Sequence, residues 1–107
     1  MVKRGDIVWA DLGEPAGRRP VCVVTRDAAI EVLTAVTCAP ITRTIRGIAS
    51  EVEIGEDEGL SETCVISCDN LVTFPKSVIA DQVAGQLSLV QRAALDRALR
   101  YALDIQY

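Results

Sequence analysis

The chain has 107 residues, half of them hydrophobic and none of them histidine, with a formal net charge of −4 at pH 7. This length suits one domain, residues 1–107, and the apolar content argues against a disordered chain. The lack of histidine excludes every mechanism that uses imidazole as a general base, and no apolar run approaches the ~20 residues of a membrane span.

The four cysteines, Cys22, Cys38, Cys64 and Cys68, all lie in apolar, strand-like runs. We interpret them as small buried hydrophobic residues of a reducing compartment. A zinc site is the alternative, but the spacing lacks a Cys-x2-Cys pair, so we expect neither a metal nor another cofactor. No apolar segment follows the positively charged start, which predicts a cytoplasmic protein without a secretion signal.

Charge is unevenly distributed along the chain. Residues 1–50 contain seven Lys/Arg and five Asp/Glu, a net of +2, whereas residues 51–107 contain four and ten, a net of −6. Six of the seven early cations are arginines, whose guanidinium groups suit forked contacts with phosphate. The asymmetry permits a local basic site on an acidic body, although charge alone favours ordinary surface residues.

The first predicted elements are a strand over residues 7–10 and a turn over 13–17. Residues 20–25 are nearly all apolar, which predicts a strand buried on both faces. A third strand is predicted over 33–41. A fourth, over 49–54, alternates apolar and acidic residues and is therefore half exposed.

The next elements are shorter. An acidic turn is predicted at 55–59, a strand at 64–68 and a turn at 69–70. Beyond them we expect an extended piece at 71–74, a helical turn near 75–78, and short extended pieces at 78–79 and 83–85.

A helix is predicted over residues 89–104, because Ser88 and Gln91 fit a capping box. Its apolar stripe is expected to pack on the sheet and contains Ala94, Leu95, Ala98, Leu99, Ala102 and Leu103. Asp96 and Arg100 are spaced for an ion pair along the helix. Six or seven short strands and one helix predict a mainly β (α+β) domain, a curled antiparallel sheet or half-open barrel covered by the C-terminal helix.

Four blocks of the sequence, in order, resemble the MazF/PemK family of toxin ribonucleases. They are an RGD-I-aromatic strand at 4–12, an Arg-Pro opening a valine-rich strand at 17–24, a P-I-T ending at 39–42, and a later strand with a polar exit at 65–75. The resemblance implies an SH3-like barrel with an added helix. It also implies a homodimer, blocked by a cognate antitoxin in a type II toxin–antitoxin system.

The activity that the resemblance implies is cleavage of single-stranded RNA without metal, leaving a 2′,3′-cyclic phosphate and a 5′-hydroxyl. The family's catalytic residues fall on Arg19, before Pro20, and on Thr42, at the end of P-I-T. A guanidinium can neutralise the developing phosphorane charge and a hydroxyl can add a donor, each typically worth about 2.7–4 kcal/mol of barrier. The general base stays open, because a guanidinium group remains protonated and a carboxylate or water could do that work.

Further RNA contacts are expected at six positions. The cationic or hydroxyl side chains near the two catalytic positions suit phosphate, and the polar pair after the later strand suits base edges: Arg18, Arg43, Thr44, Arg46, Asp69 and Asn70. Trp9 is interpreted as a core or dimer-interface residue before a base-stacking one.

The sequence departs from the family in the connection at 13–18, which is shorter than in many members, so cleavage specificity is not transferred. Two other functions stay open. A gyrase poison of the CcdB kind shares the fold class, but the ending 103–107 lacks the Trp-Gly-Ile tail of those toxins. A non-catalytic SH3-like binding module would have no reason to keep Arg19 and Thr42.

Overall fold

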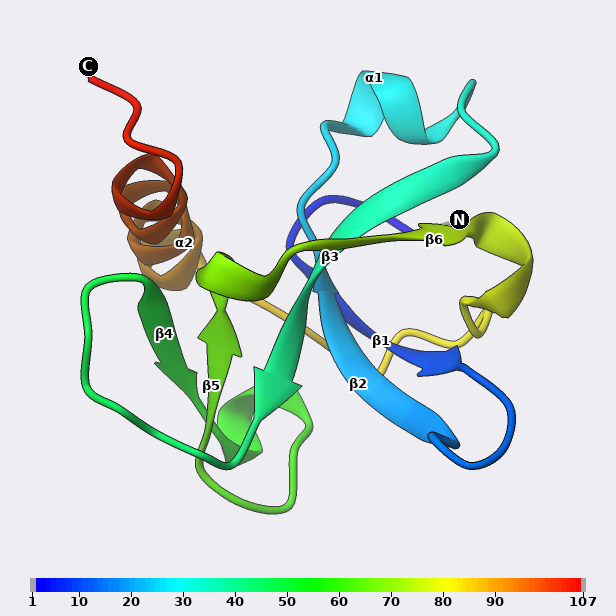
Figure 1. The fold of residues 1–107 in the computed structure, drawn as a ribbon, viewed down its shortest axis with the longest axis horizontal. Helices are drawn as coiled ribbons and strands as arrows, with labels where there is room; N and C mark the ends of the chain where they lie inside the picture. Colours follow the sequence, from blue (N-terminus) through cyan, green and yellow to red (C-terminus); the bar gives the residue numbers. More distant parts are fainter. Residues whose placement is uncertain (1, 107) are drawn as a thin grey trace.

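The computed structural model describes residues 2–106, which form a curled antiparallel sheet with one long helix at its side (Figure 1). The strands are β1 (Asp6–Asp11), β2 (Arg18–Val23), β3 (Ala35–Thr42), β4 (Glu51–Ile54), β5 (Cys64–Ser67), β6 (Val72–Pro75) and β7 (Gly85–Gln86). The α-helices are α1 (Asp27–Ile30) and α2 (Leu89–Ala102), and the 3₁₀ turns are η1 (Glu56–Glu58), η2 (Cys68–Asn70) and η3 (Lys76–Val78).

The strand order is β4-β5-β3-β2-β1-β7, and β6 pairs with β3 outside this path. All of these pairings are antiparallel. The long strand β3 is the centre of the arrangement, since it bonds to β2, β5 and β6 along different parts of its length. The curled, mainly β fold with a C-terminal helix confirms the predicted fold class.

The β2–β3 ladder is short. Val21, Cys22 and Val23 pair with Pro40, Ala39 and Cys38 in that order, and the ladder stops there. Proline has no N–H to give to a ladder, and both strands carry one at this point, Pro20 and Pro40. Beyond the prolines the two strands diverge, which Figure 1 shows toward the lower ends of β2 and β3.

Both faces of the central strands are buried. One hydrophobic cluster takes Ile7, Cys22 and Ala39 from β1, β2 and β3, while the other takes the alternate neighbours Val8, Val21, Val23 and Cys38. Successive side chains of a strand point to opposite faces, so a strand between two cores must be apolar throughout. This arrangement confirms the prediction of a doubly buried strand in residues 20–25 for Val21–Val23.

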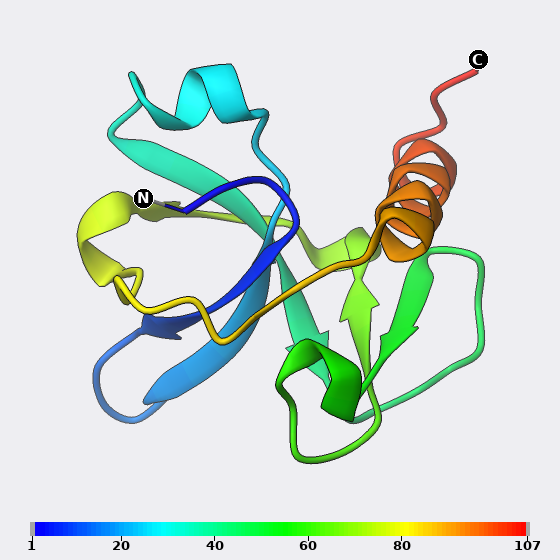
Figure 2. The same ribbon diagram turned by 180° about the vertical axis from the view of Figure 1, so that it is seen from behind.

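Helix α2 begins as the sequence predicts. Ser88 Oγ accepts from the backbone N–H of Gln91 (3.2 Å), and Gln91 Oε1 accepts from the backbone N–H of Ser88 (3.0 Å). Leu95 and Ala98 are buried in the first cluster, so the predicted stripe does pack inward. The helix lies beside β4 and η2 at one side of the sheet, as Figures 1 and 2 both show.

Two predictions about this helix are wrong. Leu103 is 54% exposed, because the helix ends at Ala102 and the chain turns away from the core. Asp96 does not pair with Arg100 as predicted but with Arg4, whose guanidinium nitrogen lies 2.7 Å from the Asp96 carboxylate. This ion pair joins the start of the chain to the helix, a long-range contact that helix spacing cannot reveal.

The turn η1 lies against the segment that enters β7. A side-chain carbon at Gly59 would collide with the carbonyl of Ala84, and one at Gly85 would collide with the carbonyl of Glu58. Gly59 also has a φ of +86°, a conformation that favours glycine. The two backbones therefore meet directly, without side chains between them.

Element boundaries differ from the predictions by a few residues. Strand β2 begins at Arg18 rather than at residue 20, and β3 spans Ala35–Thr42 rather than 33–41. The helical turn expected near 75–78 is present as η3. The short helix α1 was not predicted, because four residues are too few for an amphipathic pattern.

Candidate active site

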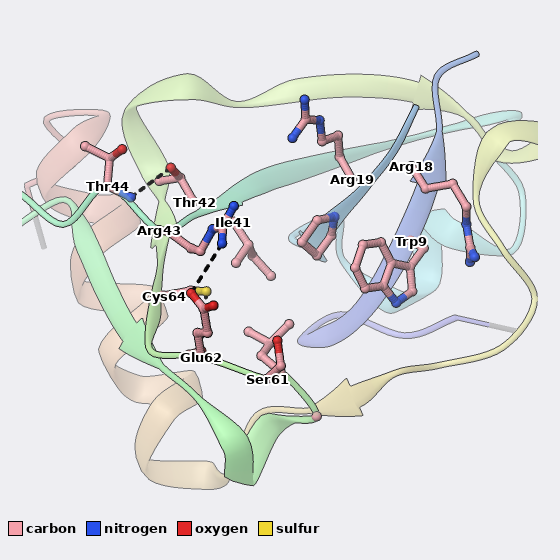
Figure 3. Close-up of a pocket in the computed structure, with 13 residues that line it drawn as sticks. Trp9, Arg18, Arg19, Ile41, Thr42, Arg43, Thr44, Ser61, Glu62 and Cys64 are labelled. Atoms are coloured by element: carbon pink, nitrogen blue, oxygen red, sulfur yellow. Dashed lines mark hydrogen bonds and ion pairs between the residues drawn. The ribbon is translucent and has the colours of Figure 1, made fainter. Parts of the chain in front are cut away.

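The divergence of β2 and β3 opens a groove of about 580 Å³. Its walls come from β1, from the start of β2, from the end of β3, and from the chain between η1 and β5 (Figure 3). The lining residues are Trp9, Arg18, Arg19, Pro20, Ile41, Thr42, Arg43, Thr44, Gly59, Leu60, Ser61, Glu62 and Cys64. Three arginines and one carboxylate thus line the groove, so its net charge is positive on an acidic chain.

Arg19 and Thr42 both line this groove, one on β2 and the other on β3. Each lies two residues beyond the last β2–β3 pair, Val21 with Pro40, so continuing that register would bring the two residues opposite one another. By strand alternation both side chains project from the same face of the sheet, and Figure 3 shows both on one side of the groove. Residues that are more than twenty positions apart in the sequence therefore share one site.

The Thr42 hydroxyl is oriented by its own loop. Its Oγ1 accepts a hydrogen bond from the backbone N–H of Thr44 (3.1 Å). The hydroxyl proton is not used in this bond and can be donated to a bound group. Arg19 has no ion pair or side-chain hydrogen bond within residues 2–106, so the salt bridge to Asp6, Asp11 or Glu14 that could explain it structurally does not form there.

Arg43 also lines the groove, where its guanidinium lies 3.4 Å from a Glu62 carboxylate oxygen. Both side chains are largely exposed, at 75% and 57%, so this pair is weak and can be exchanged for other partners. Sequence reasoning did not identify Glu62, because nothing around it distinguishes it from the other acidic residues of its loop.

Trp9 lies on the groove wall and in neither hydrophobic cluster, so a core position is wrong, while the alternative position at a dimer interface stays a prediction. It stands beside Pro20, its partner across β1 and β2. The Arg18 guanidinium lies over the indole ring, 5.5 Å from its centroid (Figure 3). Strand alternation places Trp9 on the same face of β1 as Ile7, but Trp9 lies beyond the edge of the hydrophobic cluster that contains Ile7.

Three predicted RNA contacts lie away from the groove lining. The backbone N–H of Arg46 donates to Glu51 Oε1 (3.0 Å), Asp69 Oδ2 accepts from Ser50 Oγ (2.6 Å), and Asn70 Nδ2 donates to Ser67 Oγ (2.9 Å). These bonds order the turns on which the residues stand. A role for Arg46, Asp69 and Asn70 in RNA binding stays a prediction.

The cysteines are all free and buried, as predicted. Burial raises the pKa of the Cys22 and Cys38 thiols to about 12, and that of Cys68 to about 11. Such thiols are poor nucleophiles at neutral pH, so they serve packing. Within residues 2–106, no three His, Cys, Asp or Glu side chains are grouped as metal ligands, and no helix is long and apolar enough to cross a membrane.

Known proteins resemble this chain in sequence and in structure. Residues 3–103 match the family described as PemK-like, MazF-like toxin of type II toxin–antitoxin system. Endoribonuclease MazF3 of Mycobacterium tuberculosis is 42% identical over 83% of this chain and 85% of its own length.

Two solved structures share the fold over almost their whole length. Mycobacterium tuberculosis toxin MazF-mt6 has a TM-score of 0.86 at 38% identity, covering 95% of this chain and 99% of that one. An endoribonuclease in complex with its cognate antitoxin, from a mycobacterial species, has a TM-score of 0.85 at 25% identity, covering 100% and 99%. The chain therefore belongs to the family of PemK-like, MazF-like toxins of type II toxin–antitoxin systems.

Proposed function

We propose that this toxin is an endoribonuclease that cleaves single-stranded RNA in the cytoplasm at the groove between β2 and β3, with Arg19 and Thr42 as its catalytic residues. The observation that carries the proposal is that these two side chains line one groove, on the same face of the sheet. The curated relatives that match the chain are named endoribonucleases, which supports the substrate class.

The reaction uses the nucleophile of the RNA itself. The 2′-oxygen attacks the adjacent phosphorus, the bond from phosphorus to the 5′-oxygen breaks, and a 2′,3′-cyclic phosphate and a 5′-hydroxyl result. The 2′-hydroxyl loses its proton to solvent and the departing 5′-oxygen takes one from solvent, so protons balance. The protein contributes orientation and charge stabilisation, and no metal or cofactor takes part.

Each residue has a task in this scheme. The Arg19 guanidinium donates two parallel hydrogen bonds to the non-bridging phosphate oxygens and neutralises the charge that grows in the transition state. The Thr42 hydroxyl donates a third, since its oxygen is already held by the Thr44 N–H. Arg18, Arg43 and Thr44, which line the same groove, bind neighbouring phosphates.

We further propose that a cognate antitoxin inhibits the chain by covering this groove, and that the active form is a homodimer. The first proposal is supported by the mycobacterial relative whose structure was solved with its antitoxin, at 25% identity and a TM-score of 0.85. A positive groove on an acidic body favours an antitoxin segment that carries carboxylates.

Cleavage of mixed cellular RNA in EDTA, with mapping of the new 5′ ends, tests the enzymatic proposal. We expect cutting to survive chelation and to cluster at a short motif. Arg19→Ala is expected to lower the rate by roughly 10²- to 10³-fold, and Thr42→Ala by a comparable factor, because each removes a transition-state donor.

Arg26→Ala is the matched control, since Arg26 is exposed beyond the other end of β2 and does not line the groove. It should cut RNA at the rate of the unsubstituted chain. Full activity of Arg19→Ala, or loss of cutting in EDTA alone, would contradict the mechanism. A chain that cuts no RNA but stabilises cleaved gyrase–DNA complexes would be a gyrase poison instead.

A further inference from the structure

One wall of the groove carries the aromatic side chain of Trp9, and packing in the hydrophobic core does not explain its position. Trp9 is the single tryptophan of the chain, it is only partly buried, and it belongs to neither hydrophobic cluster. A large aromatic side chain usually gains most by burial in a core. Here its indole lines the groove next to Pro20 instead.

The Trp9 indole is covered by the Arg18 guanidinium, which is held there only weakly. The Arg18 guanidinium lies 5.5 Å from the ring centroid, and Arg18 itself is exposed at the start of β2. A cation over an aromatic ring at an exposed site is held weakly. When RNA binds, the Arg18 guanidinium can leave the ring and contact a phosphate or a base instead. One face of the Trp9 indole is then free to stack on a base.

The aromatic wall and the phosphate site are close in the fold but lie on opposite sides of β2. Trp9, Pro20 and Ile41 continue the first hydrophobic cluster by strand alternation, while Arg19 and Thr42 project from the other face. A groove of about 580 Å³ is within the size range of small-ligand sites and holds both. A nucleotide whose phosphate is bound at Arg19 can therefore extend its base toward Trp9, Pro20 and Ile41 within the same groove.

We infer that Trp9 and Arg18 form a subsite that stacks one unpaired nucleobase of the RNA, next to the phosphate held by Arg19 and Thr42. This inference rests on the proposed function. An unpaired base is flat, has a π face and is joined to an anion, so it matches an indole that lies beside the Arg18 guanidinium in a groove lined by two further arginines. A single amino-acid side chain is either aromatic or anionic, whereas one nucleotide carries both a flat base and a phosphate.

The test uses the RNA segment around the mapped cut, made with 2′-fluoro sugars so that no 2′-hydroxyl can attack. Because Trp9 is the only tryptophan, its fluorescence reports on this subsite alone. We expect a saturable change in emission on titration of the unsubstituted protein. Binding by Trp9→Leu, which contains no tryptophan, is followed by the fluorescence anisotropy of a dye attached to the RNA segment, and the same signal is recorded for the unsubstituted protein. Trp9→Leu is expected to bind the segment roughly 5- to 100-fold more weakly, which is the usual worth of one stacked base. Trp9→Phe keeps a stacking ring and should lose far less.

An abasic scan separates stacking from a merely structural effect. Removal of the stacked base should weaken binding to the unsubstituted protein by the same factor as the Trp9→Leu substitution does. The same removal should not weaken binding to Trp9→Leu any further, because the stacking contact is already absent. Removal of the other bases should affect both proteins equally. The scan on the unsubstituted protein stands by itself if Trp9→Leu does not fold, since the emission change must then depend on that one base.

The subsite would be overturned if Trp9→Leu, shown to be folded by its thermal transition, bound the segment as tightly as the unsubstituted chain. It would also be overturned if no single base removal altered the Trp9 emission. In either case RNA cleavage that depends on Arg19 would leave the proposed function standing. A chain that cuts no RNA would remove both.

Discussion

Between Val21 and Val23, β2 is bonded to β3 and fully enclosed, whereas at Arg19, two residues earlier, the same strand has left that partner and lines the groove. The change happens at Pro20 and Pro40, which cannot donate to the ladder. The enclosed stretch belongs to the two hydrophobic clusters, and the open stretch carries Arg19, which we propose as a catalytic residue. The side chain proposed for catalysis therefore stands only two residues from a position enclosed on both faces.

The largest expected effect comes from weakening the strand that keeps the open end of β3 in place. Ile66 on β5 is fully buried and pairs with Ile41, next to Thr42. Ile66→Ala should lower the free energy of unfolding by roughly 2–5 kcal/mol, because it leaves a cavity in the first cluster. Urea unfolding measures this change.

Ile66→Val is the matched control and should cost about 0.5–1.5 kcal/mol. If Ile66→Ala cost no more than this, the end of β3 would not depend on its packing against β5, and the contrast between an enclosed and an open stretch would lose its basis.

Alkaline pH should lower the stability of the folded domain through the thiols of the enclosed stretch, Cys22 and Cys38. Burial raises the pKa of Cys22 and Cys38 in the folded protein from the usual 9.0 to about 12. Above pH 9 the unfolded chain loses these thiol protons while the folded chain keeps them, so stability is full below about pH 9 and is lost as the pH rises toward 12.

Urea unfolding at several pH values from about 8 to 11 measures this loss. Cys22→Ala removes one of the two thiols and should give a shallower decline with pH. An unchanged slope would mean that Cys22 does not titrate between the two states, and that its environment is less enclosed than its burial indicates.

The smallest expected effect lies in the open stretch. Glu62→Gln removes the only carboxylate among the residues that line the groove and frees Arg43 for phosphate. Stability should change by less than about 1 kcal/mol, because the ion pair is exposed. RNA affinity, measured as KM at two salt concentrations, should rise up to about fivefold at low salt and by less at high salt.

Glu53→Gln is the control for net charge, since Glu53 is exposed on β4 and does not line the groove. Equal gains from the two substitutions would attribute the effect to the acidic body as a whole, and would remove Glu62 from the site.

The sequence predicted what periodicity and capping encode. The doubly buried β2, the alternating β4 and the start of α2 at Ser88 follow from local patterns that the structure confirms. Arg19 and Thr42 were identified by the family resemblance, and singly neither would have been chosen. Their convergence depends on the β2–β3 register, which no local pattern contains.

The misses also have physical reasons. Trp9 was expected in the core or at a dimer interface, and the structure places it outside both hydrophobic clusters, beside the groove that opens where β2 and β3 diverge. Asp96 meets Arg4 rather than Arg100, because the chain start returns to the helix. Glu62 takes its importance from the neighbouring Arg43, which is far from it in sequence.

The backbone contact of Gly59 with Ala84, and of Gly85 with Glu58, bears on how the specificity of this toxin could be altered. Gly59 and Leu60 belong to the groove wall, so the position of that wall depends on a contact between main-chain atoms that a side chain at Gly59 or Gly85 would disrupt. Trp9, Arg18 and Glu62 stand outside this contact, so exchanges there would leave it intact. Under the proposed function, RNA preference is therefore best retargeted at these three positions, with both glycines kept.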